Sequence, residues 1–298
     1  MNISKNSVVC FIGDSITHHN YSLARIVAYY RENFKSAKVE FYNCGISGGT
    51  ITTVLNAFDE DVVNYDPTHA VIMIGMNDSC RDSLNGAAEA RYDALKVAFE
   101  AYKQNLKKLC DRLESMGVSI TLCTPTPYAE YMESDEPALR GGSALLLGYA
   151  NHVRTFAKER GYSLCDYHNY LTRIMQTDVL HNPDRVHPSV HGHYYIAKCF
   201  LESQGFDIGE EKGLPTDVQK WHEATVAVRQ VIATEHFIMH DDFTTTQEER
   251  VAAIKAYVDT DKEGKYVEYF KSLAREYQDL KPKYTQNLEY IKNFMKEQ

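Results

Sequence analysis

Five short apolar runs, rich in β-branched residues, alternate with longer segments in which apolar positions recur at helical spacing. The apolar runs predict buried strands at Val8–Ile12, Val39–Tyr42, Ala70–Ile74, Val118–Leu122 and Tyr162–Cys165. The helical spacing predicts helices at His18–Phe34, Arg91–Met116, Leu139–Arg160 and His191–Ser203. This alternation is typical of a parallel sheet with helices on both faces. We therefore expect an α/β fold of three layers, flavodoxin-like, with about five strands.

The pattern changes after Gly205. A glycine- and acid-containing linker, Gly205–Pro215, precedes segments that predict only helices: Thr216–His240, Thr246–Asp259, Lys262–Leu280 and Lys283–Lys296. We divide the chain into a catalytic domain, residues 1–205, and a helical extension, residues 206–298. Apolar residues at helical spacing in the extension need a partner surface, either the sheet domain or a second subunit of a homo-oligomer; they include Tyr266, Phe270, Leu273 and Tyr277.

Net charge and composition indicate which binding partners and which cellular compartment to expect. The 298-residue chain carries a net charge of −9 and has no run of lysine and arginine that would follow a phosphate backbone, so nucleic acid is not an expected partner. No segment approaches the ~20 apolar residues of a membrane span, and we expect no membrane association. The seven cysteines are scattered without a Cys-x-x-Cys pair, which favours a reducing compartment. The first strand begins close to Met1, leaving no room for a signal peptide, so the expected location is the cytoplasm.

Polar residues capable of acyl transfer follow the predicted strands. Ser15 lies in Gly13-Asp14-Ser15, at the turn between the first strand and the first helix. Asn77 follows the third strand, and a later loop carries Asp184 and His187 three residues apart. Because the carboxyl ends of parallel strands meet at one edge of the sheet, we expect these groups to lie together.

These segments together resemble the four signature blocks of the SGNH (GDSL-type) hydrolase superfamily. The blocks are Gly13-Asp14-Ser15, Asn43-Cys44-Gly45-Ile46-Ser47-Gly48-Gly49-Thr50, Gly75-Met76-Asn77-Asp78 and Asp184-Arg185-Val186-His187-Pro188. The first block departs slightly, with Ile16 where leucine is usual after the serine. The resemblance covers roughly Ser7–Gln204 and leaves the last third of the chain unmatched.

The resemblance implies a serine ester hydrolase that needs no metal or other cofactor. Ser15 would be the nucleophile, His187 the base and Asp184 the residue that orients the base. The amides of Ser15 and Gly48 and the side chain of Asn77 would form the oxyanion hole. The implied substrate is a small acyl ester, and the first candidate is an O-acetyl ester of a carbohydrate.

Two other sites fit parts of the sequence. Gly45-Ile46-Ser47-Gly48-Gly49 matches the Gly-x-Ser-x-Gly elbow of α/β-hydrolases, but only two predicted strands precede Ser47 and the usual oxyanion segment is missing upstream. A two-metal phosphoesterase could draw on acidic, amide and imidazole groups, but its Asp-x-His and Gly-Asn-His-Asp motifs do not occur. The groups considered for metal are Asp14, Asn77, Asp78, Asp184, His187, His191 and His193.

The loop Thr124–Gly142 leaves the fourth strand at the catalytic edge and is rich in polar and aromatic residues. Tyr128, Tyr131 and Arg140 of this loop, with Arg81 after the third block, are the candidate substrate-pocket residues. They suit a sugar better than a long acyl chain. A lysophospholipase or thioesterase and a catalytically idle binding protein are the alternative functions.

Overall fold

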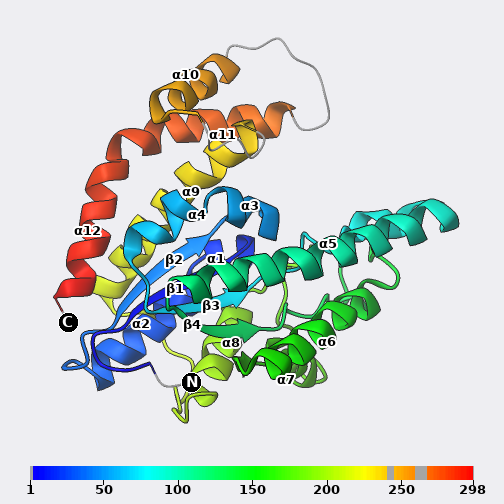
Figure 1. The fold of residues 1–298 in the computed structure, drawn as a ribbon, viewed down its shortest axis with the longest axis horizontal. Helices are drawn as coiled ribbons and strands as arrows, with labels where there is room; N and C mark the ends of the chain where they lie inside the picture. The colour runs from blue at the N-terminus through cyan, green and yellow to red at the C-terminus, as the bar shows by residue number, and fades with distance from the viewer. Residues whose placement is uncertain (1–2, 240–244, 259–266, 298) are drawn as a thin grey trace.

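The computed structural model describes residues 3–239, 245–258 and 267–297, and it contains the expected parallel sheet (Figure 1). Five strands pair in the order β2-β1-β3-β4-β5, and every pairing is parallel. The predicted α/β class is confirmed. The strands are β1 (Val8–Gly13), β2 (Glu40–Gly45), β3 (His69–Met73), β4 (Ser119–Cys123) and β5 (Ser163–Cys165).

Helices cover both faces of the sheet because the chain reverses direction after β2. It moves from β1 outward to β2 and then returns past β1 to β3, so right-handed crossovers place the later helices on the opposite face. On one face α2 packs against α8, and on the other α3 packs against α5 while α6 contacts β4 and β5. The bounds are α2 (Tyr21–Asn33), α3 (Ile51–Asn56), α4 (Phe58–Asp61), α5 (Ala88–Ser115), α6 (Gly142–Arg160), α7 (Tyr167–Ile174) and α8 (Val190–Glu202).

The predicted helix over His18–Phe34 is divided. A short helix, α1 (Ser15–His18), ends just after the first strand, and α2 begins only at Tyr21. Between them Asn20 adopts the left-handed conformation, with φ of 63°. The side chain of Asn43 in β2 fixes this turn, since its Nδ2 atom donates to Thr17 O at 2.6 Å and to Asn20 Oδ1 at 3.0 Å.

The helical extension predicted after residue 205 is present. It comprises α9 (Thr216–Met239), α10 (Gln247–Val258), α11 (Val267–Leu280) and α12 (Tyr284–Lys296). Helices α9 and α12 pack together and both contact the edge strand β2, while α10 and α11 form the upper arm in Figure 1. The predicted ends at His240, Asp259 and Lys262–Tyr266 lie outside the described residues.

Helices α9 and α12 bury apolar surface against the sheet domain. Tyr277 of α11 instead packs in a separate cluster with Val231 and Ile254, so its partner surface is the extension itself, neither the sheet domain nor a second subunit. Trp221 and Val228 of α9 and Phe294 of α12 belong to the same apolar cluster as the strands. The backbone N–H of Phe41, in the edge strand, donates to Met295 Sδ at 3.3 Å. Cover of this kind protects an edge strand from pairing with another chain. None of the helices in the described ranges has the length and apolar character that a membrane crossing requires.

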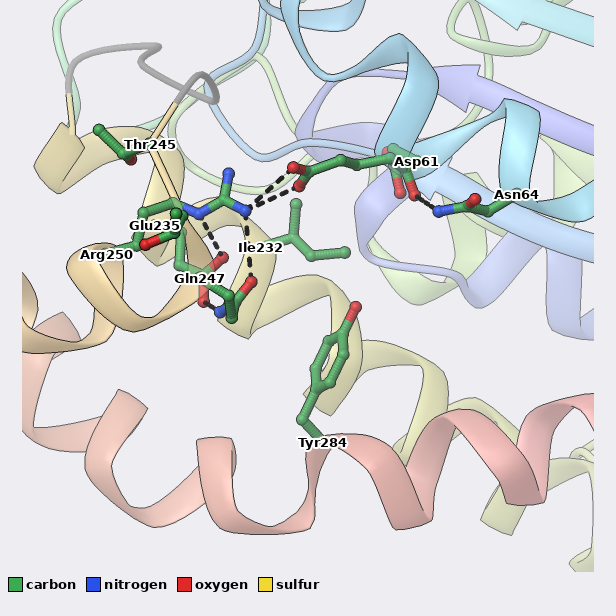
Figure 2. Close-up of a pocket in the computed structure, with 10 residues that line it drawn as sticks. Asp61, Asn64, Ile232, Glu235, Thr245, Gln247, Arg250 and Tyr284 are labelled. Atoms are coloured by element: carbon green, nitrogen blue, oxygen red, sulfur yellow. Dashed lines mark hydrogen bonds and ion pairs between the residues drawn. The ribbon is translucent and has the colours of Figure 1, made fainter.

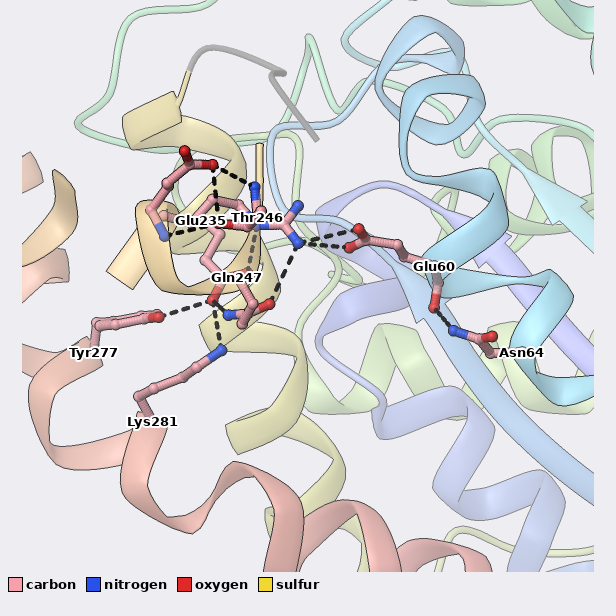
Figure 3. Close-up of polar contacts among 9 residues, drawn as sticks. Glu60, Asn64, Glu235, Thr246, Gln247, Tyr277 and Lys281 are labelled. Carbon is pink, nitrogen blue, oxygen red and sulfur yellow. Dashed lines mark hydrogen bonds and ion pairs between the residues drawn. The ribbon is translucent and has the colours of Figure 1, made fainter. Parts of the chain in front are cut away.

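A buried carboxylate joins the helices of the extension to one another. Glu235 Oε1 in α9 accepts hydrogen bonds from Gln247 Nε2 at 2.6 Å, Tyr277 Oη at 2.8 Å and Lys281 Nζ at 2.7 Å (Figure 3). Beside it, Arg250 of α10 pairs with Glu60 of α4 at 2.9 Å. Glu60, Glu235, Gln247 and Arg250 line a cavity of about 310 Å³ between the arm and the sheet domain (Figure 2).

A second charged contact anchors α9 to the sheet. Arg229 makes a bidentate ion pair with Asp61, with Nη2 to Oδ2 at 2.7 Å, and its Nε donates to Gly45 O at 2.8 Å. Arg229 is 1% exposed and Asp61 5%. Burial lowers the pKa of the guanidinium, but Asp61 outweighs this and holds that pKa above its ordinary value. The pair is therefore charged and almost fully removed from water.

Asp61→Asn should destabilise the protein by about 3–5 kcal/mol, because it leaves the Arg229 charge buried without a counter-ion. The matched control is Asp59→Asn at the exposed Arg112–Asp59 pair, where Asp59 is 76% exposed and the expected cost is below about 1 kcal/mol. Urea unfolding followed by circular dichroism measures both. Equal losses in the two variants would contradict the anchoring role of Arg229.

Candidate active site

The serine of the first block lies directly after the carboxyl end of β1. Asp14 caps α1, its Oδ1 accepting the backbone N–H of Ile16 at 3.0 Å, and this turn places Ser15 as the first helical residue. Gly45 at the end of β2 permits the close approach of α1, since a Cβ there would lie 2.4 Å from His18 N. Ser15 is 6% exposed, with its side chain directed to the neighbouring loop.

That loop supplies an imidazole and a carboxylate in line with the serine. Ser15 Oγ lies 2.7 Å from His187 Nε2, and His187 Nδ1 lies 2.7 Å from Asp184 Oδ2. Asp184 Oδ1 accepts the backbone N–H groups of Val186 and His187, both at 2.9 Å. Burial raises the pKa of Asp184, but these hydrogen bonds outweigh it and hold that pKa below its ordinary value. An ionised Asp184 therefore faces His187 at neutral pH.

Arg185, between these two residues, was not among the sequence candidates. It adopts a left-handed conformation with φ of 66° and is 5% exposed. Its guanidinium donates to the backbone carbonyls of Met132, Ser134 and Glu136, and its own carbonyl accepts the Ala129 N–H at 2.9 Å. Arg185 thus fastens the loop after β4 to the loop that carries His187. An arginine in a polar loop gives no sequence signal that distinguishes this buried role from an exposed one.

The predicted oxyanion donors lie at the ends of β2 and β3. Gly48 has φ of 70°, a conformation that favours glycine, and a Cβ there would lie 2.3 Å from Phe237 Cζ of α9. Asn77 Nδ2 donates to Gly49 O at 3.0 Å, which ties the two segments together. Arg81 donates to Met76 O at 2.8 Å, beside Asn77.

The other candidate pocket residues lie in different surroundings. Tyr128 is buried, and its Oη accepts the Leu139 N–H at 2.9 Å. Tyr131 is 81% exposed, and Arg140 is also exposed. Both tyrosines line a cavity of about 580 Å³ whose other walls come from α6, α7 and the 178–181 segment. None of Ser15, Asp184 and His187 lines that cavity.

Ser47, His191 and His193, which the alternative sites would use, have other surroundings. In the described part of the chain, no hydrogen bond joins Ser47 Oγ to an imidazole, whereas Ser15 Oγ has one. His191 lies between Asp178, at 2.8 Å, and Glu211, at 2.6 Å. His193 is 1% exposed in α8. Among the described residues, no group of three or more histidine, cysteine, aspartate or glutamate side chains could hold a metal ion.

Two further carboxyl groups are buried beneath the site. Burial raises the pKa of Asp14 to about 6, although the Ile16 N–H opposes the shift. Burial also raises the pKa of Asp78 to about 7, against the hydrogen bond that its Oδ1 accepts from Ile51 N at 3.0 Å. Asp78 Oδ2 is buried without a hydrogen-bond partner among the described residues. Burying an ionised carboxylate is costly, so both groups bind a proton at a higher pH than an exposed aspartate does.

Residues 9–200 match the family model described as GDSL-like Lipase/Acylhydrolase. The chain belongs to this family. An acetylxylan esterase from Geobacillus stearothermophilus is 28% identical to this GDSL-like hydrolase over an alignment of 224 residues, which covers 70% of this chain and 98% of that protein. Its solved structure has a TM-score of 0.58 at 27% identity and covers 71% of this chain and all of the other. Solved forms called catalytic mutants of that esterase carry alanine in place of a serine, an aspartate or a histidine.

A gut microbial diltiazem-metabolizing enzyme is similar in fold over nearly the whole chain. The TM-score is 0.74 at 14% identity, and the alignment covers 99% of this chain and 96% of that one. At this identity the likeness shows the fold alone. The family membership and the esterase relative show that this GDSL-like hydrolase is a carboxylic ester hydrolase.

The buried carboxyl groups predict a pH-dependent effect of Asp78→Asn. An unfolded aspartate has a pKa near 3.9, below the folded value of about 7, so ionisation of Asp78 removes stability as pH rises between the two. The asparagine variant lacks this loss and keeps an oxygen for the Ile51 N–H. Its free energy of unfolding relative to wild type should increase from about pH 5 to about pH 8 in urea titrations. The exposed Asp82→Asn is the control, and a flat difference for Asp78→Asn would contradict the prediction.

Proposed function

We propose that this enzyme removes small acyl groups, acetyl first among them, from carbohydrate esters by a Ser15–His187–Asp184 triad. The observation that carries the proposal is the continuous chain of two 2.7 Å contacts from Ser15 Oγ through the imidazole to Asp184. Distances of this size allow direct proton transfer between heavy atoms. The reaction uses side chains and backbone of the protein and water, with no cofactor.

In the first half-reaction Ser15 Oγ attacks the ester carbonyl carbon while its proton passes to His187 Nε2. Asp184 holds the ring so that Nδ1 carries its hydrogen, and it stabilises the imidazolium that forms. The tetrahedral intermediate collapses, the bond to the alcohol oxygen breaks, and His187 returns the proton to that oxygen. Water then attacks the acyl-Ser15 ester through the same steps and releases the carboxylic acid.

The negative oxygen of each intermediate needs donors that are already in place. The backbone N–H groups of Ser15 and Gly48 and the amide of Asn77 supply them in this proposal. Asn77 Nδ2 carries two hydrogens, and its contact with Gly49 O uses one of them, which leaves the other for the substrate. The same contact fixes the amide orientation before substrate arrives, so little reorganisation accompanies the reaction.

The acyl group and the alcohol are inferred from the relative and from charge. The acetylxylan esterase matches over 98% of its own length, which supports acetyl as the acyl group and a sugar hydroxyl as the alcohol. The net charge of −9 disfavours substrates of net negative charge, such as anionic lysophospholipids. A small-molecule ester is therefore the proposed partner, rather than a membrane lipid or a nucleic acid.

Wild type should release acetate from acetylated xylooligosaccharides, whereas Ser15→Ala should lose several orders of magnitude in kcat. Ser47→Ala is the matched control and should keep most of the activity, since Ser47 contacts no described imidazole. Acetate release measures the activity of each variant, and a 4-nitrophenyl ester series from acetyl to dodecanoyl measures the preferred acyl length. Organophosphate labelling of Ser47 would refute the nucleophile, and a rate that rises with chain length would refute the small acyl group.

Asn77→Ala should lower kcat by roughly 10²–10³-fold with a modest change in KM, as for loss of one oxyanion donor. The donor acts on a charge that is present only in the transition state. Steady-state kinetics on 4-nitrophenyl acetate give the two parameters separately, and a thermal melt checks that the variant is folded. An unchanged kcat in a folded variant would show that Asn77 only links the ends of β2 and β3.

A further inference from the structure

One face of α9 runs along the catalytic edge of the sheet. His222, Val226, Gln230, Ala233 and Phe237 recur at intervals of three or four residues, which places them on one side of the helix. At one end of the face, His222 Nδ1 lies 3.4 Å from Asn20 Nδ2 and its ring packs on Tyr21 with centroids 4.6 Å apart. At the other end, Phe237 occupies the space beside Gly48. The extension thus forms a wall from the α1–α2 turn to a proposed oxyanion donor.

A cavity of about 360 Å³ opens between this wall and the α1–α2 turn. His19 and Tyr21 form its catalytic-domain side, while Val226, Ala227 and Gln230 of α9 line the opposite side. Glu276 and Leu280 of α11 complete it. Its volume falls within the roughly 300–1,000 Å³ range of small-molecule sites.

His19 connects the cavity to the proposed catalytic base. The rings of His19 and His187 lie with their centroids 5.2 Å apart. Burial and the neighbouring His187 lower the pKa of His19 to about 4, so this ring is neutral at physiological pH and does not repel a protonated His187. None of Ser15, Asp184 and His187 lines the cavity, so the His19 ring is its link to the imidazole that must deliver a proton to the departing alcohol.

The chemistry of the lining suits a polyhydroxylated ring. Tyr21, Val226 and Leu280 offer apolar surface to the carbon face of a sugar. Gln230 and the carboxylates of Glu223 and Glu276 can accept hydrogen bonds from hydroxyl groups. The described residues that line the cavity include two carboxylates and no lysine or arginine, so a phosphate-bearing alcohol is disfavoured there.

We propose that this cavity binds the alcohol portion of the ester, a neutral sugar ring, and that the C-terminal helices thereby determine which alcohols the enzyme accepts. The inference rests on the ester hydrolysis proposed above. The leaving oxygen must reach His187 Nε2 to receive its proton, so the alcohol lies on the histidine side of the site, where His19 of the cavity packs beside the His187 ring. Residues of α9 and α11 act here as specificity residues, outside the bond-breaking chemistry.

The first test fills the cavity and compares two alcohols. Ala227→Trp should lower kcat/KM for acetylated xylobiose at least about tenfold, while kcat/KM for ethyl acetate, whose alcohol is minimal, stays within about twofold. Lys220→Trp adds the same side chain at an exposed position of α9 and should change neither value. Thermal melts and labelling of Ser15 by a small organophosphate establish that each variant is folded with an intact site.

The second test changes charge without filling space. Glu276 is exposed at the cavity rim, so Glu276→Lys should fold normally. Wild type should hydrolyse glycerol monoacetate faster than acetylglycerol phosphate, and Glu276→Lys should reduce this preference several-fold. Glu268→Lys, on an exposed position of α11 outside the cavity, is the control and should leave the preference unchanged.

The outcomes separate the two proposals. Wild type that hydrolyses none of these acetates would overturn the proposed function, and the role of the cavity with it. If wild type is active and folded Ala227→Trp has kcat/KM values reduced equally for both substrates, or reduced for neither, only the proposed role of the cavity is overturned. An unchanged preference in Glu276→Lys would do the same. Wild type that cleaves ethyl acetate but not acetylated xylobiose would overturn the sugar as the alcohol.

Discussion

The buried Arg229–Asp61 pair determines how the extension meets the catalytic edge. Asp61 ends a short helix just beyond the edge strand, and Arg229 also binds the carbonyl of Gly45, the last residue of β2. Two charges withdrawn from water tolerate little displacement, because separating them leaves each unpaired in a medium of low dielectric constant. The register of α9 along the sheet is thereby fixed. Phe237 at one end of α9 and His222 at the other then occupy defined places beside the site.

Burial and hydrogen bonding also shift the pKa values of the titratable groups around Ser15. Burial lowers the pKa values of His19 and His181 to about 4, which keeps both rings neutral. Desolvation raises the pKa values of Asp14 and Asp78, to about 6 and about 7. Asp184 differs because two backbone N–H groups and the His187 ring stabilise its charge. His187 is thus the imidazole in this cluster that faces an ionised carboxylate at hydrogen-bond distance, which is the condition a general base requires.

The similar proteins match different lengths of the chain, and the difference between them lies in the C-terminal helices. The acetylxylan esterase corresponds to about 70% of the chain, and the family match ends at residue 200. The diltiazem-metabolizing enzyme shares the fold over 99% of the chain, C-terminal helices included. The chemistry is associated with the family core, whereas the helices beyond it build a wall that a shorter esterase core does not require.

The sequence by itself determined the elements and the candidate reacting groups. Strand periodicity, helix periodicity and four short blocks are local patterns, so the parallel sheet, the helical extension and the identities of Ser15, Asp184 and His187 could be predicted from neighbouring residues. Only the tertiary structure decided what depends on distant partners. Asn43 hydrogen-bonds the turn that divides the first helix, Arg185 holds a loop some fifty residues earlier, and Arg229 pairs with Asp61 across 168 positions. Nothing in a local pattern indicates that an arginine or asparagine will be buried, because burial of a polar side chain is favourable only when its partner arrives from elsewhere in the chain.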